Sequence, residues 1–574
     1  MNVLDEFKRW ESANLTKKEK QELRGFDEKK IKENFTEEIS FGTAGMRGTV
    51  ELGISKMNRF TVKRATEGVS KFILEKKKAK RGVVISYDTR RMSKEFAILV
   101  AKTLSYYGIK AYIFSDVHPV PMCSFAIRHL KAYMGIMITA SHNPKEYNGY
   151  KVYGEDGAQL SPEDTNEVVK YIKQIDYFTT DIPIEKISLS GKEGTKLDEN
   201  IEVISNKVDE AYYKALQKLV LSKKELKEYG PKCKIVYTPL HGSGYIPVTT
   251  ILGRIGLKVK VVPEQKDPDT EFSTVKVPNP EMPDALDMGI KLAKKVNATV
   301  VMGTDPDCDR LGVAVKNDEG EYVLLNGNQI GALLLDYILF KNQQNKTLPK
   351  NAAFVKTIVT TRLAKRIGAH YKTKCFDVLT GFKFIGEKIK EWEKSGKYTF
   401  MFGYEESFGY LCGTHSRDKD AAVSSMLFAE MTCFYQSIGK TVYQRLQELF
   451  EEYGYFVEKT LNFVYMGLEG KATMNRIMKK LDSFVPETLG GLKVENTEFY
   501  NRRERIFPDG KVTKILLPKT SACFYNLEND NWVAIRPSGT EPKLKAYIAT
   551  NAKSKKEAEE LNEKIKKAIQ KILH

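Results

Sequence analysis

The stretch YMGIMITASHNP, residues 133–144, decides the fold class. Its apolar first half has the length and composition of a buried strand, and it ends in a polar loop that carries Ser141. The same pattern, an apolar run followed by a polar loop, recurs along the chain at 82–91, 234–244, 298–310, 352–361 and 398–410. Each copy has amphipathic helical residues next to it. This alternation predicts α/β domains with mixed or mainly parallel sheets, in which ligands bind at the carboxyl ends of the strands.

The length of 574 residues fits three or four domains at about 150 residues each. Shifts in composition predict a helical N-terminal extension and four domains, the last of them α+β, at 1–35, 36–195, 206–316, 317–455 and 456–574. No apolar run approaches the roughly 18 residues of a membrane span, and the first residues have no hydrophobic signal core, so we expect a cytoplasmic protein with no membrane partner. The seven cysteines contain no CxxC pair, which argues against a disulfide framework and a zinc site.

The net charge of +18 raises the question of an anionic partner. Lysines are interleaved with glutamates along the chain, and we find no zinc finger, RNA-recognition signature or basic-aromatic stripe. The sequence therefore argues against a nucleic-acid partner. A surplus of positive charge also suits small phosphate substrates, which it would attract.

The segment GTDPDCDR, residues 303–310, follows a strand-like run and carries three alternating aspartates. In extended backbone a two-residue period places Asp305, Asp307 and Asp309 on one side, and three converging carboxylates suit Mg²⁺ or Ca²⁺. An EF-hand would need Gly and Glu where this chain has Arg310 and Lys316. The alternative is a solvated acidic turn, in which the three like charges would repel one another.

Three other loops are less specific on their own. RPSGTEPK, residues 536–543, combines an arginine fork, hydroxyls, a glycine and Lys543, a set suited to phosphate, although it also fits an ordinary loop. GYEESFGY, residues 403–410, fits either a sugar-hydroxyl contact or an exposed acidic loop. Ser141 lies in no nucleophile elbow, and its neighbour His142 does not establish a triad.

Taken in order, five motifs resemble the α-D-phosphohexomutase superfamily, and most closely its long phosphoglucomutase branch, which also contains phosphopentomutases. They are FGTAGMRG (41–48), TASHNPKEYNGYK (139–151), GTDPDCDRLG (303–312), GYEESFGY (403–410) and RPSGTEPK (536–543). The resemblance implies four domains around a central cleft. Three are related α/β domains, for phosphoserine, metal and sugar, and a smaller C-terminal domain carries the phosphate loop.

The resemblance also implies roles for individual residues. Ser141 is expected to be the phosphoserine, and Asp305, Asp307 and Asp309 would hold Mg²⁺ together with a phosphoserine oxygen. Arg47 and Arg310 match arginines beside that site. Lys151, Lys419 and His142 are candidates for the proton transfers; the alternative for Lys419, between Asp418 and Asp420, is a surface ion pair.

For the substrate, the resemblance implies contacts from the sugar-reading loops and a clamp for the non-reacting phosphate. The matching residues are Thr380, Glu405 and Ser407 for the sugar, and Arg536, Ser538, Gly539 and Thr540 for the phosphate. Pro306 stands where many relatives have glycine in the metal loop, but the carboxylate spacing is kept. The loop reads EES rather than the EQS of glucosamine-type mutases.

The sequence thus predicts interconversion of glucose 1-phosphate and glucose 6-phosphate by a monomer or dimer, with glucose 1,6-bisphosphate as intermediate and activator. Phosphopentomutase and phosphomannomutase activities, and a synthase that releases the bisphosphate, remain open alternatives. A phosphohydrolase and a non-catalytic phosphate- or nucleic-acid-binding module are the alternatives from other classes.

Overall fold

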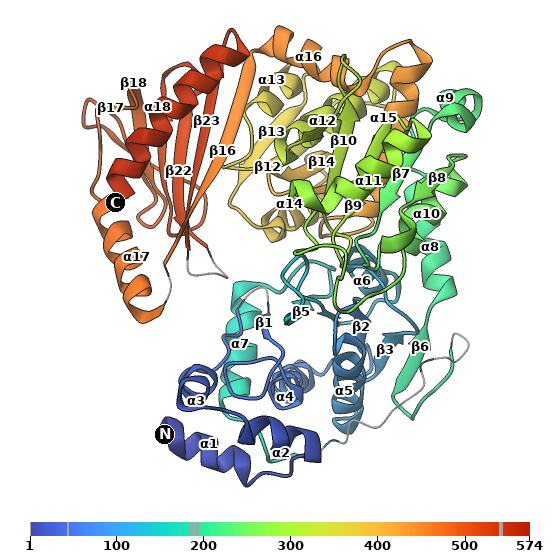
Figure 1. Ribbon diagram of the computed structural model, residues 1–574, viewed down its shortest axis with the longest axis vertical. Helices are drawn as coiled ribbons and strands as arrows, with labels where there is room; N and C mark the ends of the chain where they lie inside the picture. The colour runs from blue at the N-terminus through green and yellow to red at the C-terminus, as the bar shows by residue number, and fades with distance from the viewer. Residues whose placement is uncertain are drawn as a thin grey trace. The chain divides into compact units, whose positions relative to one another are not determined.

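The computed structural model describes residues 2–42, 45–180, 182, 189, 194–465, 467–538 and 543–573. Much of the predicted linker at 180–205, together with Gly539 and Thr540, lies outside the described residues. The chain divides into two compact units, which we describe separately (Figure 1). Unit 1 comprises Met1–Asn326, Ile385–Gly396 and Phe408–Gly439, and unit 2 comprises Gly327–Phe384, Lys397–Ser407 and Lys440–His574.

The first sheet of unit 1 has the strand order β1-β5-β4-β2-β3-β6. Its central strands β2 (Val83–Tyr87) and β4 (Met134–Ile138) are fully buried and parallel, so the loops that follow them begin side by side. The other strands are β1 (Met46–Thr49), β3 (Ala111–Phe114), β5 (Tyr147–Tyr153) and β6 (Ile201–Ile204), and the helices are α4 (Arg59–Glu75), α5 (Ser93–Tyr106), α6 (Val120–His129) and α7 (Pro162–Lys173). Ser161 caps α7, accepting a hydrogen bond from the Asp164 amide.

The second sheet of unit 1 has the order β11-β10-β9-β7-β8, with β7 (Ile235–Thr238), β8 (Val259–Val261) and β9 (Val300–Thr304) parallel. Strand β10 (Leu311–Lys316) turns back antiparallel to β9 and pairs with β11 (Tyr322–Leu325). The three aspartates lie in the tight connection between β9 and β10. The remaining elements are α8 (Asn206–Gln217), α9 (Lys223–Tyr229), α10 (Tyr245–Arg254), α11 (Pro283–Val296), β15 (Gly409–Cys412) and α15 (Ala421–Ser437).

Unit 2 begins with three parallel strands of a four-stranded sheet of order β13-β12-β14-β15, in which β12 (Ala352–Thr357) lies between β13 (Lys374–Val378) and β14 (Thr399–Glu405). The carboxyl ends of these strands meet at one edge, which is where the predicted sugar contacts Thr380 and Glu405 lie. The helices of this part are α12 (Gly327–Gln344), α13 (Leu363–His370), α14 (Phe382–Ser395, which continues into unit 1) and α16 (Val442–Tyr453).

The C-terminal part of unit 2 is an antiparallel sheet with helices, as expected for an α+β domain. Its strand order is β16-β23-β22-β21-β18-β19-β20, with β17 paired to β18. The strands are β16 (Tyr455–Val464), β17 (Thr488–Leu489), β18 (Leu492–Phe499), β19 (Glu504–Ile506), β20 (Val512–Lys514), β21 (Cys523–Leu527), β22 (Trp532–Pro537) and β23 (Lys543–Ala552); the helices are α17 (Gly467–Leu481) and α18 (Lys555–Leu573). The prediction of α/β domains followed by a C-terminal α+β domain is confirmed.

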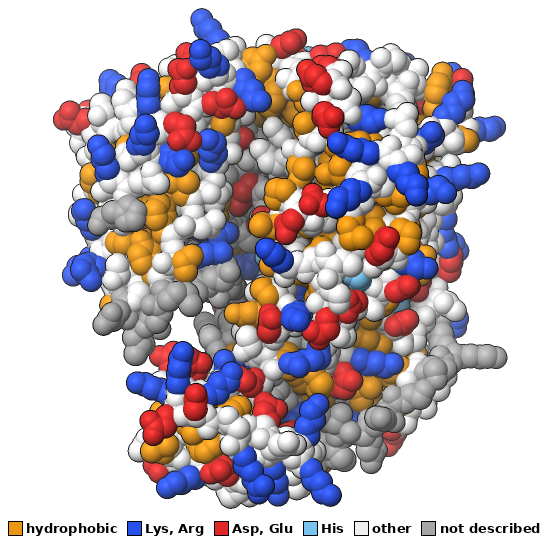
Figure 2. Space-filling model, viewed as in Figure 1, with side chains coloured by type: hydrophobic (Ala, Val, Ile, Leu, Met, Phe, Trp, Pro, Cys, Tyr) orange, Lys and Arg blue, Asp and Glu red, His pale blue; other side chains and the backbone are white. Residues whose placement is uncertain are grey.

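Charged side chains of both signs are interspersed on the face drawn in Figure 2. The basic surplus is therefore not gathered into a single stripe on this face, as the interleaving of lysine and glutamate in the sequence predicts. Among the described residues, no helix combines the length and apolarity needed to cross a bilayer.

The N-terminal residues form three helices, α1 (Val3–Glu11), α2 (Lys17–Arg24) and α3 (Glu28–Phe35). Their centre is Trp10, which is fully buried and packs edge-on against Phe35, Phe60 and Phe178. Its indole nitrogen donates to Glu6 at 3.1 Å. Since Phe60 lies on α4, this aromatic cluster joins the N-terminal helices to the helical layer of the first sheet.

We expect Trp10→Ala to lower the free energy of unfolding by about 3–5 kcal/mol, because it removes the largest buried side chain of this cluster and leaves a cavity. Urea denaturation followed by circular dichroism measures the loss. The control is Leu4→Ala in the same helix, where the side chain is 53% exposed and the expected change is within about 0.5 kcal/mol. Equal effects of the two variants would contradict a role of Trp10 in anchoring the helices.

Candidate active site

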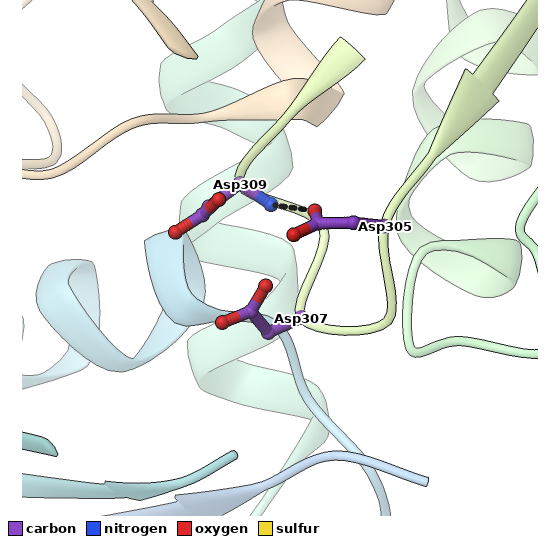
Figure 3. A group of neighbouring side chains, drawn as sticks. All are labelled: Asp305, Asp307 and Asp309. Carbon is purple, nitrogen blue, oxygen red and sulfur yellow. Dashed lines mark hydrogen bonds between the residues drawn. The ribbon is translucent and has the colours of Figure 1, made fainter. Parts of the chain in front are cut away.

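The β9–β10 connection brings the carboxylates of Asp305, Asp307 and Asp309 together (Figure 3). One oxygen from each lies within 4.8 Å of the others, and all three side chains are buried. The backbone shapes the loop: Asp305 Oδ1 accepts hydrogen bonds from the amides of Asp309 at 3.1 Å and Arg310 at 3.0 Å. The spacing predicted from the sequence therefore converges as expected, although in a turn rather than in extended backbone.

These carboxylates fit a bound cation. Within the described part of the chain, Asp307 Oδ1 and Asp309 Oδ1 are buried and accept no hydrogen bond. Burial, together with the charges of Asp307 and Asp309, raises the pKa of Asp305 well above its usual value. Three clustered carboxylates with unsatisfied oxygens are ligands that suit a hard divalent ion such as Mg²⁺.

Ser141 faces this triad from the loop after β4. Its Oγ donates to Asp305 Oδ2 at 2.7 Å and lies 3.1 Å from His142 Nδ1. The Ser141 backbone has φ of 54°, in the left-handed region that a residue other than glycine seldom adopts. Such strain concentrates at functional sites and persists only where the surroundings impose it.

Two lysines from distant parts of unit 1 neutralise part of the triad's charge. Lys151, on β5, lies 2.7 Å from Asp307 Oδ2, and Lys419, before α15, lies 3.1 Å from Asp309 Oδ2. Burial alone would lower the pKa of Lys151, but Asp307 and Asp309 raise it, so this side chain is charged. Lys419 is 9% exposed, so its pair with Asp418 at 3.0 Å is not the surface ion pair that the sequence left open.

The two predicted arginines lie around the same loops. Arg47 donates to the side chain of Asn143 at 2.9 Å, two residues after Ser141. Arg310 forms an ion pair with Glu281, and its Nε lies 3.9 Å from Asp309 Oδ1. Burial lowers the pKa of His142 well below its usual value, and the nearby Arg310 and Arg47 add to this effect, so the imidazole is neutral.

Several residues that support this site were not singled out from the sequence. Asp418 accepts from Lys419, from Tyr153 at 3.2 Å and from Gln159 at 3.1 Å, so β5 and its following loop fix the carboxylate that holds Lys419. Asp420 caps α15 through the amides of residues 422 and 423. The sequence signal was the pair of aspartates flanking Lys419, for which a surface ion pair was the alternative interpretation.

In unit 2, the predicted sugar-contact residues lie at the common edge of β12, β13 and β14. Glu405 is buried, and its Oε1 accepts from the amide of Gly381, next to Thr380, at 2.9 Å. Ser407 follows in the same loop and is half-buried. The structure thus brings together two loops that are more than twenty residues apart in the sequence.

The third loop of this edge was missed. Thr357, at the end of β12, donates to Glu406 Oε2 at 3.2 Å and lies 2.7 Å from the Thr360 hydroxyl. Burial raises the pKa of Glu406 to about 7; Glu405 adds to the shift, while Lys545 and Arg536 oppose it. The sequence signal that could have identified this loop is a strand that ends in threonines at the ligand-binding edge of a parallel sheet.

Of the predicted phosphate loop, Arg536, Ser538 and Lys543 are described. The Ser538 amide donates to the Lys543 carbonyl at 2.8 Å, which closes the base of the loop between β22 and β23. Arg536 pairs across the sheet with Lys545, so two cationic side chains belong to neighbouring strands there. This is a suitable base for binding a phosphate dianion.

Comparison with known families agrees with this geometry. Models of phosphoglucomutase/phosphomannomutase α/β/α domains I, II and III match residues 38–178, 210–320 and 326–453, and the model of the C-terminal domain matches 502–568. The chain belongs to this family. The predicted superfamily and its four domains are therefore confirmed.

Relatives in the family span nearly the whole chain. The chain is 38% identical over 515 residues to a phosphoglucomutase of Staphylococcus epidermidis, covering 89% of this chain and 90% of that protein. It is 35% identical over 522 residues to a phosphoglucomutase of Staphylococcus aureus, covering 90% of each. The fold is similar to that of the Paramecium phosphoglucomutase pp63/parafusin in its open form, with a TM-score of 0.68 and 18% identity over 94% of this chain and 95% of that one.

We expect Asp307→Asn to weaken Mg²⁺ binding at least about tenfold, since changes even to the residues behind a metal ligand cost that much. Isothermal titration calorimetry with Mg²⁺ and Mn²⁺ measures the affinity. The matched control is Asp318→Asn, in the exposed turn between β10 and β11, which should bind as the parent does. Unchanged affinity in Asp307→Asn would contradict a metal site at the triad.

The raised pKa of Glu406 predicts a pH-dependent stability. Between about pH 4.5 and 7 the unfolded chain loses this proton while the folded chain keeps it, so folding stability falls as the pH rises through that window. Glu406→Gln has no carboxyl at this position, so its folding stability should not fall for this reason. The Tm of Glu406→Gln relative to that of the parent should therefore rise between pH 4.5 and 7. Thermal melts of Glu406→Gln and of the exposed control Glu451→Gln measure the difference; parallel pH profiles of parent and Glu406→Gln would contradict the assignment.

Proposed function

We propose that the chain interconverts glucose 1-phosphate and glucose 6-phosphate through a phosphorylated Ser141 and a glucose 1,6-bisphosphate intermediate. The observation that carries the proposal is the Ser141 hydroxyl, held 2.7 Å from a buried three-aspartate cluster whose other two members pair with Lys151 and Lys419. The curated relatives named phosphoglucomutase support the choice of sugar.

In this proposal Asp305, Asp307 and Asp309 would hold Mg²⁺, with an oxygen of phosphorylated Ser141 as a further ligand. When bound, Mg²⁺ withdraws charge from the phosphoryl oxygens. Lys151, which is charged and buried beside the triad, adds positive charge where a loose, in-line transfer spreads negative charge over the equatorial oxygens. Arg47 and Arg310 extend that positive surface toward the incoming substrate.

A sugar hydroxyl that attacks phosphorylated Ser141 must lose a proton, and Ser141 Oγ must gain one as it leaves in the same step. In the reverse transfer the Ser141 hydroxyl loses the proton and the leaving sugar oxygen gains one. His142, Lys151 and Lys419 are the candidates. His142 Nδ1 lies 3.1 Å from Ser141 Oγ and the imidazole is neutral, which suits proton acceptance, whereas Lys151 is charged, which suits donation and charge stabilisation.

The substrate's other end is assigned to unit 2. Thr380, Glu405 and Ser407 would accept and donate to sugar hydroxyls. Arg536, Ser538, Gly539, Thr540 and Lys543 would clamp the non-reacting phosphate. One clamp and one hydroxyl-reading edge could serve both orientations of the bisphosphate, as the proposed reaction requires. We assign the phosphoserine, metal, sugar and phosphate roles to domains 36–195, 206–316, 317–455 and 456–574.

Phosphomannomutase activity is the second candidate, because the family that matches includes phosphomannomutases. Phosphopentomutase activity, release of the bisphosphate, and a monomeric or dimeric cytoplasmic enzyme stay predictions from the sequence.

The test compares kcat/KM for glucose 1-phosphate, mannose 1-phosphate and ribose 1-phosphate, with Mg²⁺ and a trace of the matching bisphosphate. We expect glucose 1-phosphate to be preferred at least about tenfold, and Ser141→Ala to lose at least about 10³-fold in kcat because the phosphoryl acceptor is absent. A preference for mannose or ribose would replace the sugar and keep the mechanism. Full activity of Ser141→Ala, or release of inorganic phosphate in step with turnover, would overturn the phosphoserine mutase.

A further inference from the structure

Arg90, in the loop after β2, binds the Ser141 loop through its backbone. Its Nη2 donates to the carbonyls of Ser141, at 2.5 Å, and of Asn143. Its Nη1 donates to the carbonyls of Pro144 at 2.9 Å and Tyr147 at 3.2 Å. All four terminal N–H groups of the guanidinium are thus directed at one seven-residue loop.

The Arg90 side chain is itself fixed in place. It is fully buried, as is Asp88, whose Oδ2 lies 3.4 Å from Arg90 Nε. The guanidinium stands 5.1 Å from the centre of the Phe272 ring, and Asp88 Oδ1 accepts from the Ser93 hydroxyl at 2.7 Å. Removing one partner of a buried ion pair is strongly unfavourable, so Asp88 and Arg90 stabilise each other's buried charge.

Thr139 acts on the other side of Ser141. The Thr139 hydroxyl accepts from the Ser141 amide at 2.8 Å and donates to Asp88 Oδ2 at 2.6 Å. The peptide groups before and after Ser141 are therefore both held by one network, the first by Thr139 and the second by Arg90. Fixing both peptide groups imposes the left-handed φ of 54°, and this conformation directs Oγ toward Asp305.

We propose that Arg90 and Thr139 are positioning residues that hold Ser141 in its left-handed conformation for phosphoryl transfer. The inference rests on the proposed function of Ser141 as phosphoryl carrier. It assigns the role of Arg90 to the shape of its four-donor fork rather than to its charge. A lysine at position 90 keeps the charge but has one donor group, so it cannot replace the fork.

The contrast between charge and shape gives the experiment. In Arg90→Lys and in Arg90→Met we expect kcat to fall by about 10²-fold, the cost of displacing a reacting group by about 1 Å. KM for glucose 1-phosphate should change little, because the residues assigned to sugar and non-reacting phosphate are untouched. Two further measurements report on the loop: single-turnover transfer from phosphorylated enzyme to glucose 1-phosphate, and hydrogen exchange of the peptide spanning 139–147.

The matched controls are Arg91→Lys and Arg91→Met. Arg91 is the exposed next residue and donates to the Val50 carbonyl at 3.1 Å, so these variants should transfer the phosphoryl group as the parent does. Wild-type rates in Arg90→Lys with loss only in Arg90→Met would show that charge suffices and would overturn the inference. Faster exchange of 139–147 with unchanged transfer would also overturn it.

A second pair decides the matter if the Arg90 variants do not fold. Thr139→Val keeps the shape and removes the hydroxyl, whereas Thr139→Ser keeps the hydroxyl. We expect transfer to be slow in Thr139→Val and restored in Thr139→Ser; equal rates in both would overturn the inference. The proposed function has a separate outcome, since a parent enzyme that neither carries phosphate on Ser141 nor isomerises glucose 1-phosphate fails before any variant is compared.

Discussion

Three carboxylates buried within 4.8 Å of one another are the constraint on which unit 1 depends. At an effective dielectric constant of about 20, two unit charges about 4 Å apart repel by about 4 kcal/mol. Asp305, Asp307 and Asp309 would therefore drive their loop apart without counter-charges. Backbone amides offset part of this repulsion at Asp305, and lysines offset part of it at the other two.

The counter-charges come from far along the chain. Lys151 precedes the triad by more than 150 residues, and Lys419 follows it by more than 100, yet both reach it within about one hydrogen-bond length. Both lysines belong to unit 1, which takes in residues 408–439 as well as the first 326. Electrostatic compensation of one loop thus brings together three segments of the chain.

The sequence predicted those parts of the site whose chemistry is written in consecutive residues. The alternating aspartates, the Ser141 loop and the strands before them could be identified because spacing and apolar runs are local properties. The hydrogen bonds of Arg90 to the Ser141 loop could not be predicted, because its partners are backbone carbonyls, which any sequence supplies. Lys419 was ambiguous for a related reason: whether an Asp-Lys-Asp segment is surface or interior depends on Tyr153 and Gln159, which are more than 250 residues earlier.

The carboxylates at the edge of unit 2 are held by groups of another kind than those that hold the triad. Glu405 and Glu406 are held by neutral donors, the Gly381 amide and the Thr357 hydroxyl, so neither of these bonds commits a carboxylate to a cation. Arg536 and Lys545 oppose the raised pKa of Glu406 through their charge. In the proposed reaction the neutral donors matter, because a carboxylate already bound to an arginine would accept a sugar hydroxyl poorly. Hydroxyl and amide donors can fix the acidic side chains without an ion pair in these two bonds.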